Sequence, residues 1–151
     1  MNVGAKREIL ADSPLFDNLL PAELGMLADL FSVRDYRAGE VVFHEGDVGD
    51  CLYVVAEGEV EVLQKGASGA LTPIVTLRPP HFFGEMSLID KEYRSATVRA
   101  RTEAKLLQLA NENLHSFAKN YRNGFTWVVV NIAKVLSSRL RETNKRLAAK
   151  L

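Results

Sequence analysis

Cysteine, net charge and long apolar runs are all scarce in this sequence, and each shortage excludes a class of protein. Cys51 is the only cysteine, so an internal disulfide cannot form, which excludes a disulfide-stapled secreted scaffold and indicates a reducing compartment. The 19 basic and 19 acidic residues give zero net charge, so no overall positive field attracts nucleic acid or an anionic membrane. We therefore expect a cytoplasmic protein with neither nucleic acid nor membrane among its partners.

The apolar runs are too short for a membrane span. The most apolar stretch, "FTWVVVNIA" at residues 125–133, is about half of the roughly 18 residues that a span needs, so it indicates a buried helix face. Charged residues also interrupt residues 1–20 before any apolar run reaches the length of a signal peptide.

Motifs of metal and nucleotide chemistry are missing as well. His44, His81 and His115 lack the close spacing of metal ligands, and no Gly-x-Ser-x-Gly nucleophile elbow occurs. The glycine-rich "QKGASGALT" at residues 64–72 lacks the Gly-Lys-Ser/Thr ending of a P-loop. We therefore predict that the chain is no enzyme and needs no metal or cofactor, with a cupin-type metalloenzyme on a similar β-roll as an alternative.

The periodicity of apolar residues divides the chain into helix, strands and helix. Apolar residues recur at helical intervals over residues 3–31, and Ser13-Pro14 and Pro21 break this region into two helices joined by a short turn. From Val33 onward, six or more short runs rich in β-branched and aromatic residues alternate with glycine-containing turns. Short strands at intervals of about ten residues favour a compact antiparallel barrel or sandwich.

Helical periodicity returns after Leu109. We predict one helix that starts at Asn111 as its cap, and a final helix from Asn123-Gly124 nearly to Leu151. No linker or repeat interrupts the 151 residues, of which 47% are apolar, so we expect a single domain over residues 1–151.

The final helix also carries a second pattern. Residues at alternating steps of four and three are typical of a coiled-coil seam, although the same stripe would also suit packing on the barrel. The charged end "RLRETNKRLAAKL", residues 139–151, favours pairing with a second copy, because so many charges cannot be buried in a monomer. The seam consists of Val129, Ala133, Leu136, Leu140, Thr143 and Leu147.

The stretch "FGEMSL", residues 83–88, has the residue types of an anion site. Gly84 lets backbone amides approach a ligand, and the residues after it can form a helical turn with free N–H groups. Glu85 can accept a hydrogen bond from a sugar hydroxyl, and Arg94 can hold two phosphate oxygens, with Ser95 as a neutral donor. The bland alternative is an ordinary ion pair between Glu85 and Arg94.

Two motifs together resemble a known family. "FFGEMSLIDKEYRSATVRA", residues 82–100 and hereafter the cassette, resembles the phosphate-binding cassette of cyclic-nucleotide-binding domains, which include the catabolite activator protein and protein kinase A regulatory subunits. "AGEVVFHEGDVGDCLYVVAEGEVEV", residues 38–62, resembles the glycine-punctuated β-roll of that family. The resemblance implies an antiparallel β-roll (a double-stranded β-helix, jelly-roll-like) over residues 33–110, flanked by N-terminal helices in 1–31 and C-terminal helices in 111–151.

The resemblance also implies a role for each residue of the site. Glu85 would hold the ribose 2′-hydroxyl, Arg94 the cyclic phosphate, and Thr143 with Asn144 would lie near the purine. The full implied ligand-binding set is Gly84, Glu85, Met86, Ser87, Arg94, Ser95, Ala96, Thr143 and Asn144.

We therefore expect a regulatory sensor of cAMP, or of cGMP, that signals to a downstream protein partner through movement of its C-terminal helix and that forms a homodimer. A structural dimerisation module without a ligand is the alternative. The chain has Pro80-His81 where the family often has Gly-Asp, and Tyr93 where it often has proline before the arginine, which affects loop rigidity. Ending at Leu151, the chain leaves no room for a helix-turn-helix domain, so we expect a stand-alone sensor or a piece of a longer chain.

Overall fold

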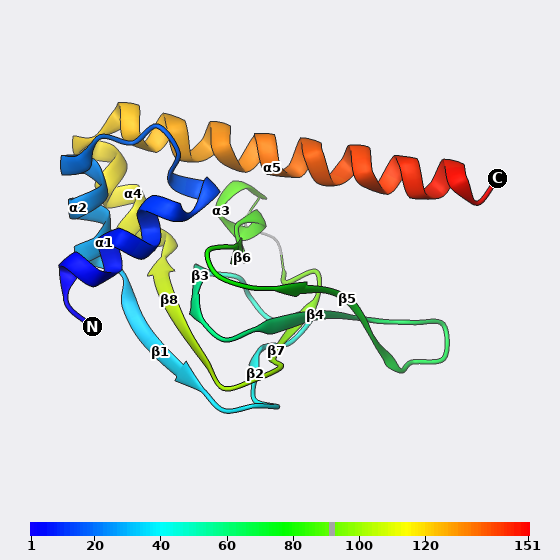
Figure 1. Cartoon of the computed structure of the whole chain (residues 1–151). Helices are drawn as coiled ribbons and strands as arrows, with labels where there is room; N and C mark the ends of the chain where they lie inside the picture. Colours follow the sequence, from blue (N-terminus) through cyan, green and yellow to red (C-terminus); the bar gives the residue numbers. More distant parts are fainter. Residues whose placement is uncertain (91–92) are drawn as a thin grey trace.

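Two four-stranded antiparallel sheets face each other in the computed structural model, which describes residues 1–90 and 93–151 (Figure 1). One sheet has the strand order β1-β8-β3-β6 and the other β2-β7-β4-β5. Helices precede the first strand and follow the last one in the sequence. This arrangement confirms the predicted antiparallel β-roll with flanking helices. The strands are β1 (Ser32–Tyr36), β2 (Val41–Phe43), β3 (Cys51–Glu57), β4 (Val60–Lys65), β5 (Leu71–Leu77), β6 (Phe82–Phe83), β7 (Thr97–Ala100) and β8 (Ala104–Ala110).

The central strand β3 is buried on both faces, which explains its unbroken apolar sequence "CLYVV". Successive side chains of a strand point to opposite faces. Leu52 and Val54 accordingly join the core beneath the helices, whereas Cys51, Tyr53 and Val55 join the core inside the roll. The helices and the roll therefore share one sheet as their common wall.

Helices from both ends of the chain cover the outer face of this wall (Figure 1). As the prolines predicted, α1 (Val3–Asp12) ends before a short 3₁₀ turn, η1 (Pro14–Phe16), and α2 (Pro21–Leu30) begins at the second proline. The other covering helices are α4 (Asn111–Asn120) and the first part of α5 (Arg122–Ala149).

Two details of the C-terminal helices differ from the sequence prediction. The cap position of α4 is Ala110, and Asn111 is the first residue inside the helix. Its Nδ2 donates to the Ser87 carbonyl at 3.4 Å, while its Oδ1 makes no capping bond among the described residues. The final helix begins one residue earlier than predicted, at Arg122.

The long helix α5 is anchored at one end and exposed at the other. Buried Asn131 donates hydrogen bonds to the carbonyls of Leu15 and Asp17, at 2.9 and 2.8 Å, and so ties α5 to η1. Beyond this point the outer half of α5, residues 136–149, extends past the other helices and over the roll (Figure 1). Among the described residues, no helix combines the length and apolar character needed to cross a membrane.

One turn glycine tolerates no side chain. Gly58, between β3 and β4, has φ +77°, and a Cβ there would overlap the carbonyl oxygen of Glu103 and lie 2.9 Å from the Cα of Ala104. Gly39 also has a positive φ, +90°, but no atom lies within 4 Å of the place of its Cβ. A side chain at Gly39 would therefore add backbone strain alone, whereas a side chain at Gly58 would add both backbone strain and steric overlap.

We predict that Gly58→Ala lowers the free energy of unfolding by about 3 kcal/mol or more, because strain and backbone overlap add. Gly39→Ala, which meets only the strain of a left-handed residue, should lose about 1–2 kcal/mol. Urea unfolding followed by circular dichroism measures both, and equal losses would show that the overlap at residue 58 is relieved without cost.

Candidate functional site

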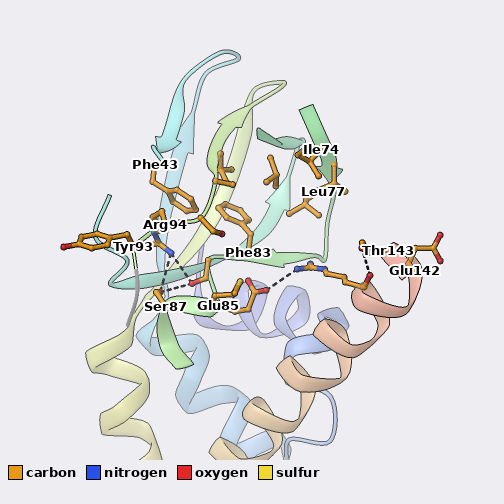
Figure 2. A pocket seen from close by; sticks show the side chains of 18 of the residues that line it. Phe43, Ile74, Leu77, Phe83, Glu85, Ser87, Tyr93, Arg94, Glu142 and Thr143 are labelled. Atoms are coloured by element: carbon orange, nitrogen blue, oxygen red, sulfur yellow. Dashed lines mark hydrogen bonds and ion pairs between the residues drawn. The ribbon is translucent and has the colours of Figure 1, made fainter. Parts of the chain in front are cut away.

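A cavity of about 700 Å³ lies between the roll and the outer half of α5 (Figure 2). Its apolar wall comes from the roll, and includes Val62 of β4 and Ile74 and Leu77 of β5. Its floor comes from the cassette, which includes the five-residue helix α3 (Met86–Asp90). The wall that closes it on the remaining side comes from α5: Ser138, Arg139, Glu142, Thr143 and Arg146.

The structure brings most of the predicted site residues to this cavity. Those that line it are Gly84, Glu85, Met86, Ser87, Arg94, Ser95, Ala96 and Thr143. Asn144, which was also predicted, does not line the cavity of its own chain. Residues 91–92, which the sequence places in the loop between Glu85 and Arg94, lie outside the described residues.

The guanidinium of Arg94 is a buried charge at the cavity, with 6% of the residue exposed. Its Nη1 donates to the Gly84 carbonyl at 3.1 Å, its Nη2 donates to the Cys51 carbonyl at 2.8 Å, and its Nε has no hydrogen-bond partner among the described residues. The guanidinium carbon also lies 4.1 Å from the centroid of the Phe43 ring, in cation–π geometry. Neutral groups thus hold the cation in place.

No carboxylate forms an ion pair with Arg94 among the side chains that the structure describes. A buried cation is costly unless an anion or several hydrogen bonds compensate it. The free Nε and the carbonyl-bound Nη groups therefore form a site that an anion of the right size would complete.

Two glycines make room for this arginine. Gly84 has φ +81°, and a Cβ there would lie 2.8 Å from Nη1 of Arg94. At Gly49, a Cβ would lie 2.5 Å from the Cβ of Ser87 and 3.4 Å from the Cδ of Arg94. The sequence places Gly49 only in a turn, so its closeness to the site emerges from the tertiary structure alone.

Glu85 faces the same cavity but pairs with a different arginine. The carboxylate is 5% exposed, and its Oε1 lies 3.2 Å from Nη1 of Arg139 on α5 (Figure 2). The ordinary Glu85–Arg94 ion pair considered from the sequence is absent from the described contacts. Arg139 was missed because it is one of several arginines in a charged helix end, with nothing local to distinguish it.

Three aromatic rings support the guanidinium from inside the roll. Tyr53 and Phe83 stack with their centroids 5.0 Å apart, and Phe43 lies 6.0 Å from Tyr53 and 5.9 Å from Phe83. Burial raises the pKa of the Tyr53 phenol far above its ordinary value, and a hydrogen bond with Cys51 raises it further, so the phenol stays neutral. The rings therefore form an uncharged platform beside Arg94.

The histidines do not gather at this site, and in residues 1–90 and 93–151 no three side chains of His, Cys, Asp or Glu are grouped so that they could hold a metal ion. The site thus combines the buried Glu85 carboxylate and Arg94 guanidinium with charged side chains of α5, hydroxyl groups and apolar side chains.

Comparison with known sequences decides the family. Residues 33–121 match the family model described as the cyclic nucleotide-binding domain. The chain belongs to this family. The membership confirms the resemblance seen in the cassette and in residues 38–62, and cyclic nucleotide-binding domains share the β-roll found here.

The relatives are regulatory proteins. The chain is 36% identical over 135 residues to the cyclic AMP receptor protein of Thermus thermophilus, covering 89% of this chain and 61% of that protein. It is 35% identical over 103 residues to the cAMP-dependent protein kinase regulatory subunit of Emericella nidulans, covering 68% of this chain and 24% of that one. The chain therefore spans less than two thirds of either relative.

A solved structure shows the same fold with a ligand. The regulatory domain of Toxoplasma gondii PKA with cAMP superposes with a TM-score of 0.71 at 26% identity, over 76% of this chain and 44% of that chain. The cyclic nucleotide-binding fold of this chain is thus shared with a protein solved in complex with cAMP.

Proposed function

We propose that this chain binds cAMP, or else cGMP, in the cavity beneath α5, and that it is a regulatory sensor. The observation that carries the proposal is the buried Arg94: within residues 1–90 and 93–151, no described carboxylate neutralises its charge and its Nε has no hydrogen-bond partner. A cyclic phosphate carries one negative charge and two free oxygens, which suit a planar guanidinium. The ligand-bound relative supports this choice.

The rest of the cavity suits a ribose and a purine. Buried Glu85 lies on the floor beside Arg94, where its carboxylate would accept a hydrogen bond from the ribose 2′-hydroxyl. Apolar Val62, Ile74 and Leu77 offer a flat-sided wall for a base. Across from them, the hydroxyl of Thr143 donates to the Arg139 carbonyl at 2.9 Å, so its oxygen is free to accept from a purine N–H.

We also propose a homodimer through α5, which the exposed seam supports. Leu140 and Leu147 are 61% and 58% exposed although both lie in the apolar repeat, so this outer end of the seam does not pack on its own roll. A second α5 in a parallel coiled coil would cover them. This arrangement accounts for more than the exposure of two leucines, because it also gives Asn144 a place.

In the coiled-coil repeat with Leu140 and Thr143 as seam positions, Arg139 and Asn144 lie on opposite flanks of the seam. Parallel helices bring these flanks together across the interface, one from each copy. Asn144 of a second copy would then approach the cavity that Arg139 lines. The predicted role of Asn144 near the purine is therefore compatible with its absence from the cavity of its own chain.

We further propose that α5 carries the signal. Glu85 contacts α5 through Arg139 at 3.2 Å, and a bound ribose would use the same carboxylate, so ligand and helix meet at one group. A ligand shifts a conformational equilibrium only as far as it binds one state better. The outer half of α5 would occupy one position with ligand bound and another without it. The contacts of Arg139 and Thr143 would differ between these two positions, and a downstream protein would respond to the change in helix position.

Calorimetric titration tests the ligand. We expect cAMP or cGMP to bind with micromolar or tighter affinity, and the 2′-deoxy analogue of the preferred ligand to bind about tenfold more weakly because Glu85 loses its hydroxyl partner. Arg94→Ala should lose about 100-fold or more, since charge-assisted bonds to the phosphate disappear. Arg101→Ala, a control in a surface pair with Glu59, should leave affinity unchanged. Absence of binding to either nucleotide would favour a ligand-free dimerisation module.

Analytical ultracentrifugation tests the seam. Leu140→Lys should shift the protein from dimer to monomer, because a charge in a coiled-coil seam must be desolvated. Leu71→Lys introduces the same change at an exposed position on β5, away from α5, and should leave the dimer intact. A dimer that survives Leu140→Lys must associate through another surface.

Hydrogen exchange tests the signal. Cyclic nucleotide should change amide protection in residues 136–149 of the wild type, and Arg139→Ala should reduce that change while ligand still binds, because the link to Glu85 is cut. Arg141→Ala, whose side chain does not line the cavity, serves as the control. An identical response in both variants would show that Arg139 does not couple α5 to the ligand.

A further inference from the structure

Behind Arg94, on the side of the strands β3 and β8, lies a chain of hydrogen bonds that the ligand-binding set does not include. Nη2 of Arg94 lies 3.5 Å from the sulfur of Cys51, and Nε2 of Gln108 donates to the same sulfur at 3.2 Å. The other end of the Gln108 amide accepts from Nε of Arg34 at 2.7 Å. This series of hydrogen bonds therefore connects Arg34 at the surface to buried Arg94.

The sulfur of Cys51 acts as an acceptor for two donors. Cys51 is buried, and its carbonyl also accepts from Nη2 of Arg94, at 2.8 Å, so backbone and side chain of one residue hold the same guanidinium nitrogen. Neighbouring Tyr53 stays protonated, since burial and its bond to Cys51 raise the pKa of the phenol. The described groups that meet Arg94 from behind are thus the neutral carbonyl and sulfur of Cys51.

This neutrality matters for the ligand. A carboxylate in the place of the thiol would orient the guanidinium but would also cancel its charge and compete with the phosphate. A sulfur is a weak, uncharged acceptor, so it fixes the plane of the guanidinium while leaving the charge for an anion. The Phe43 ring, 4.1 Å from the guanidinium carbon, restricts the same plane from a second direction.

We propose that Cys51 and Gln108 are positioning residues that hold the guanidinium plane of Arg94 toward the phosphate of the ligand. The proposal rests on the proposed binding of a cyclic nucleotide, and it adds two residues that never touch that ligand. Affinity is then set by the orientation of Arg94 as well as by its charge.

A set of variants at one position provides the test. Cys51→Val keeps an apolar side chain of similar size but removes the acceptor, and we expect cAMP affinity to fall about 3- to 10-fold. Cys51→Ser restores an acceptor at that position and should recover affinity to within about twofold of the wild type. Gln108→Met, a half-buried position with less effect on folding, should lose about 2- to 5-fold.

A second measurement separates positioning from packing. The two phosphorothioate diastereomers of cAMP replace one or the other free phosphate oxygen, so a fixed guanidinium distinguishes them. Their affinity ratio should fall toward one in Cys51→Val and stay at the wild-type value in Cys51→Ser. Val55→Ala, on the same strand and in the same core, is the control: its thermal stability should fall and its ratio should not change.

The inference is overturned if Cys51→Val keeps the wild-type ratio, or if Val55→Ala changes the ratio equally. These outcomes leave the proposed function intact, because they presuppose that the wild type binds cAMP. Failure of the wild type to bind either cyclic nucleotide, or an unchanged affinity in Arg94→Ala, would instead refute the proposed function itself.

Discussion

A buried guanidinium whose described hydrogen-bond partners are all neutral is the constraint on which this site depends. Arg94 is enclosed by two backbone carbonyls, a thiol and an aromatic ring, and its charge has no described carboxylate to meet it. Folding such a cation into a protein costs free energy, which the surrounding β-roll must supply. The anionic ligand proposed above would compensate this buried charge.

The features around Arg94 follow from that constraint. Gly49 and Gly84 lack side chains where a Cβ would collide with Ser87 or with Arg94 itself. Glu85 pairs with Arg139 and forms no described ion pair with Arg94, so the two charged ends of the site are distinct. Because that contact comes from α5, the floor of the cavity and the helix above it share one ion pair.

The sequence is sufficient for much of this structure. Strand and helix periodicities predict the roll and its flanking helices, since a sheet buried on both faces and an amphipathic helix leave different patterns. The cassette residues were identified because they are close together in the chain. Phe43 and Arg139 were not, because their roles arise from contacts between segments far apart. The predicted cap at Asn111 is wrong because the helix starts one residue earlier than expected, with Ala110 at the cap position.

The anchoring of α5 at Asn131 has a mechanical consequence. From residue 131 to residue 149 the helix is about 27 Å long at 1.5 Å per residue, with its base tied to η1 and its far end unsupported. A rigid rod fixed at one end converts a small rotation into a large sweep, so a tilt of about 10° would carry the tip about 5 Å. A shift of α5 beside Glu85 that is only a fraction of this tip movement would therefore become a larger movement at the far end of the helix. The helix would not need to refold.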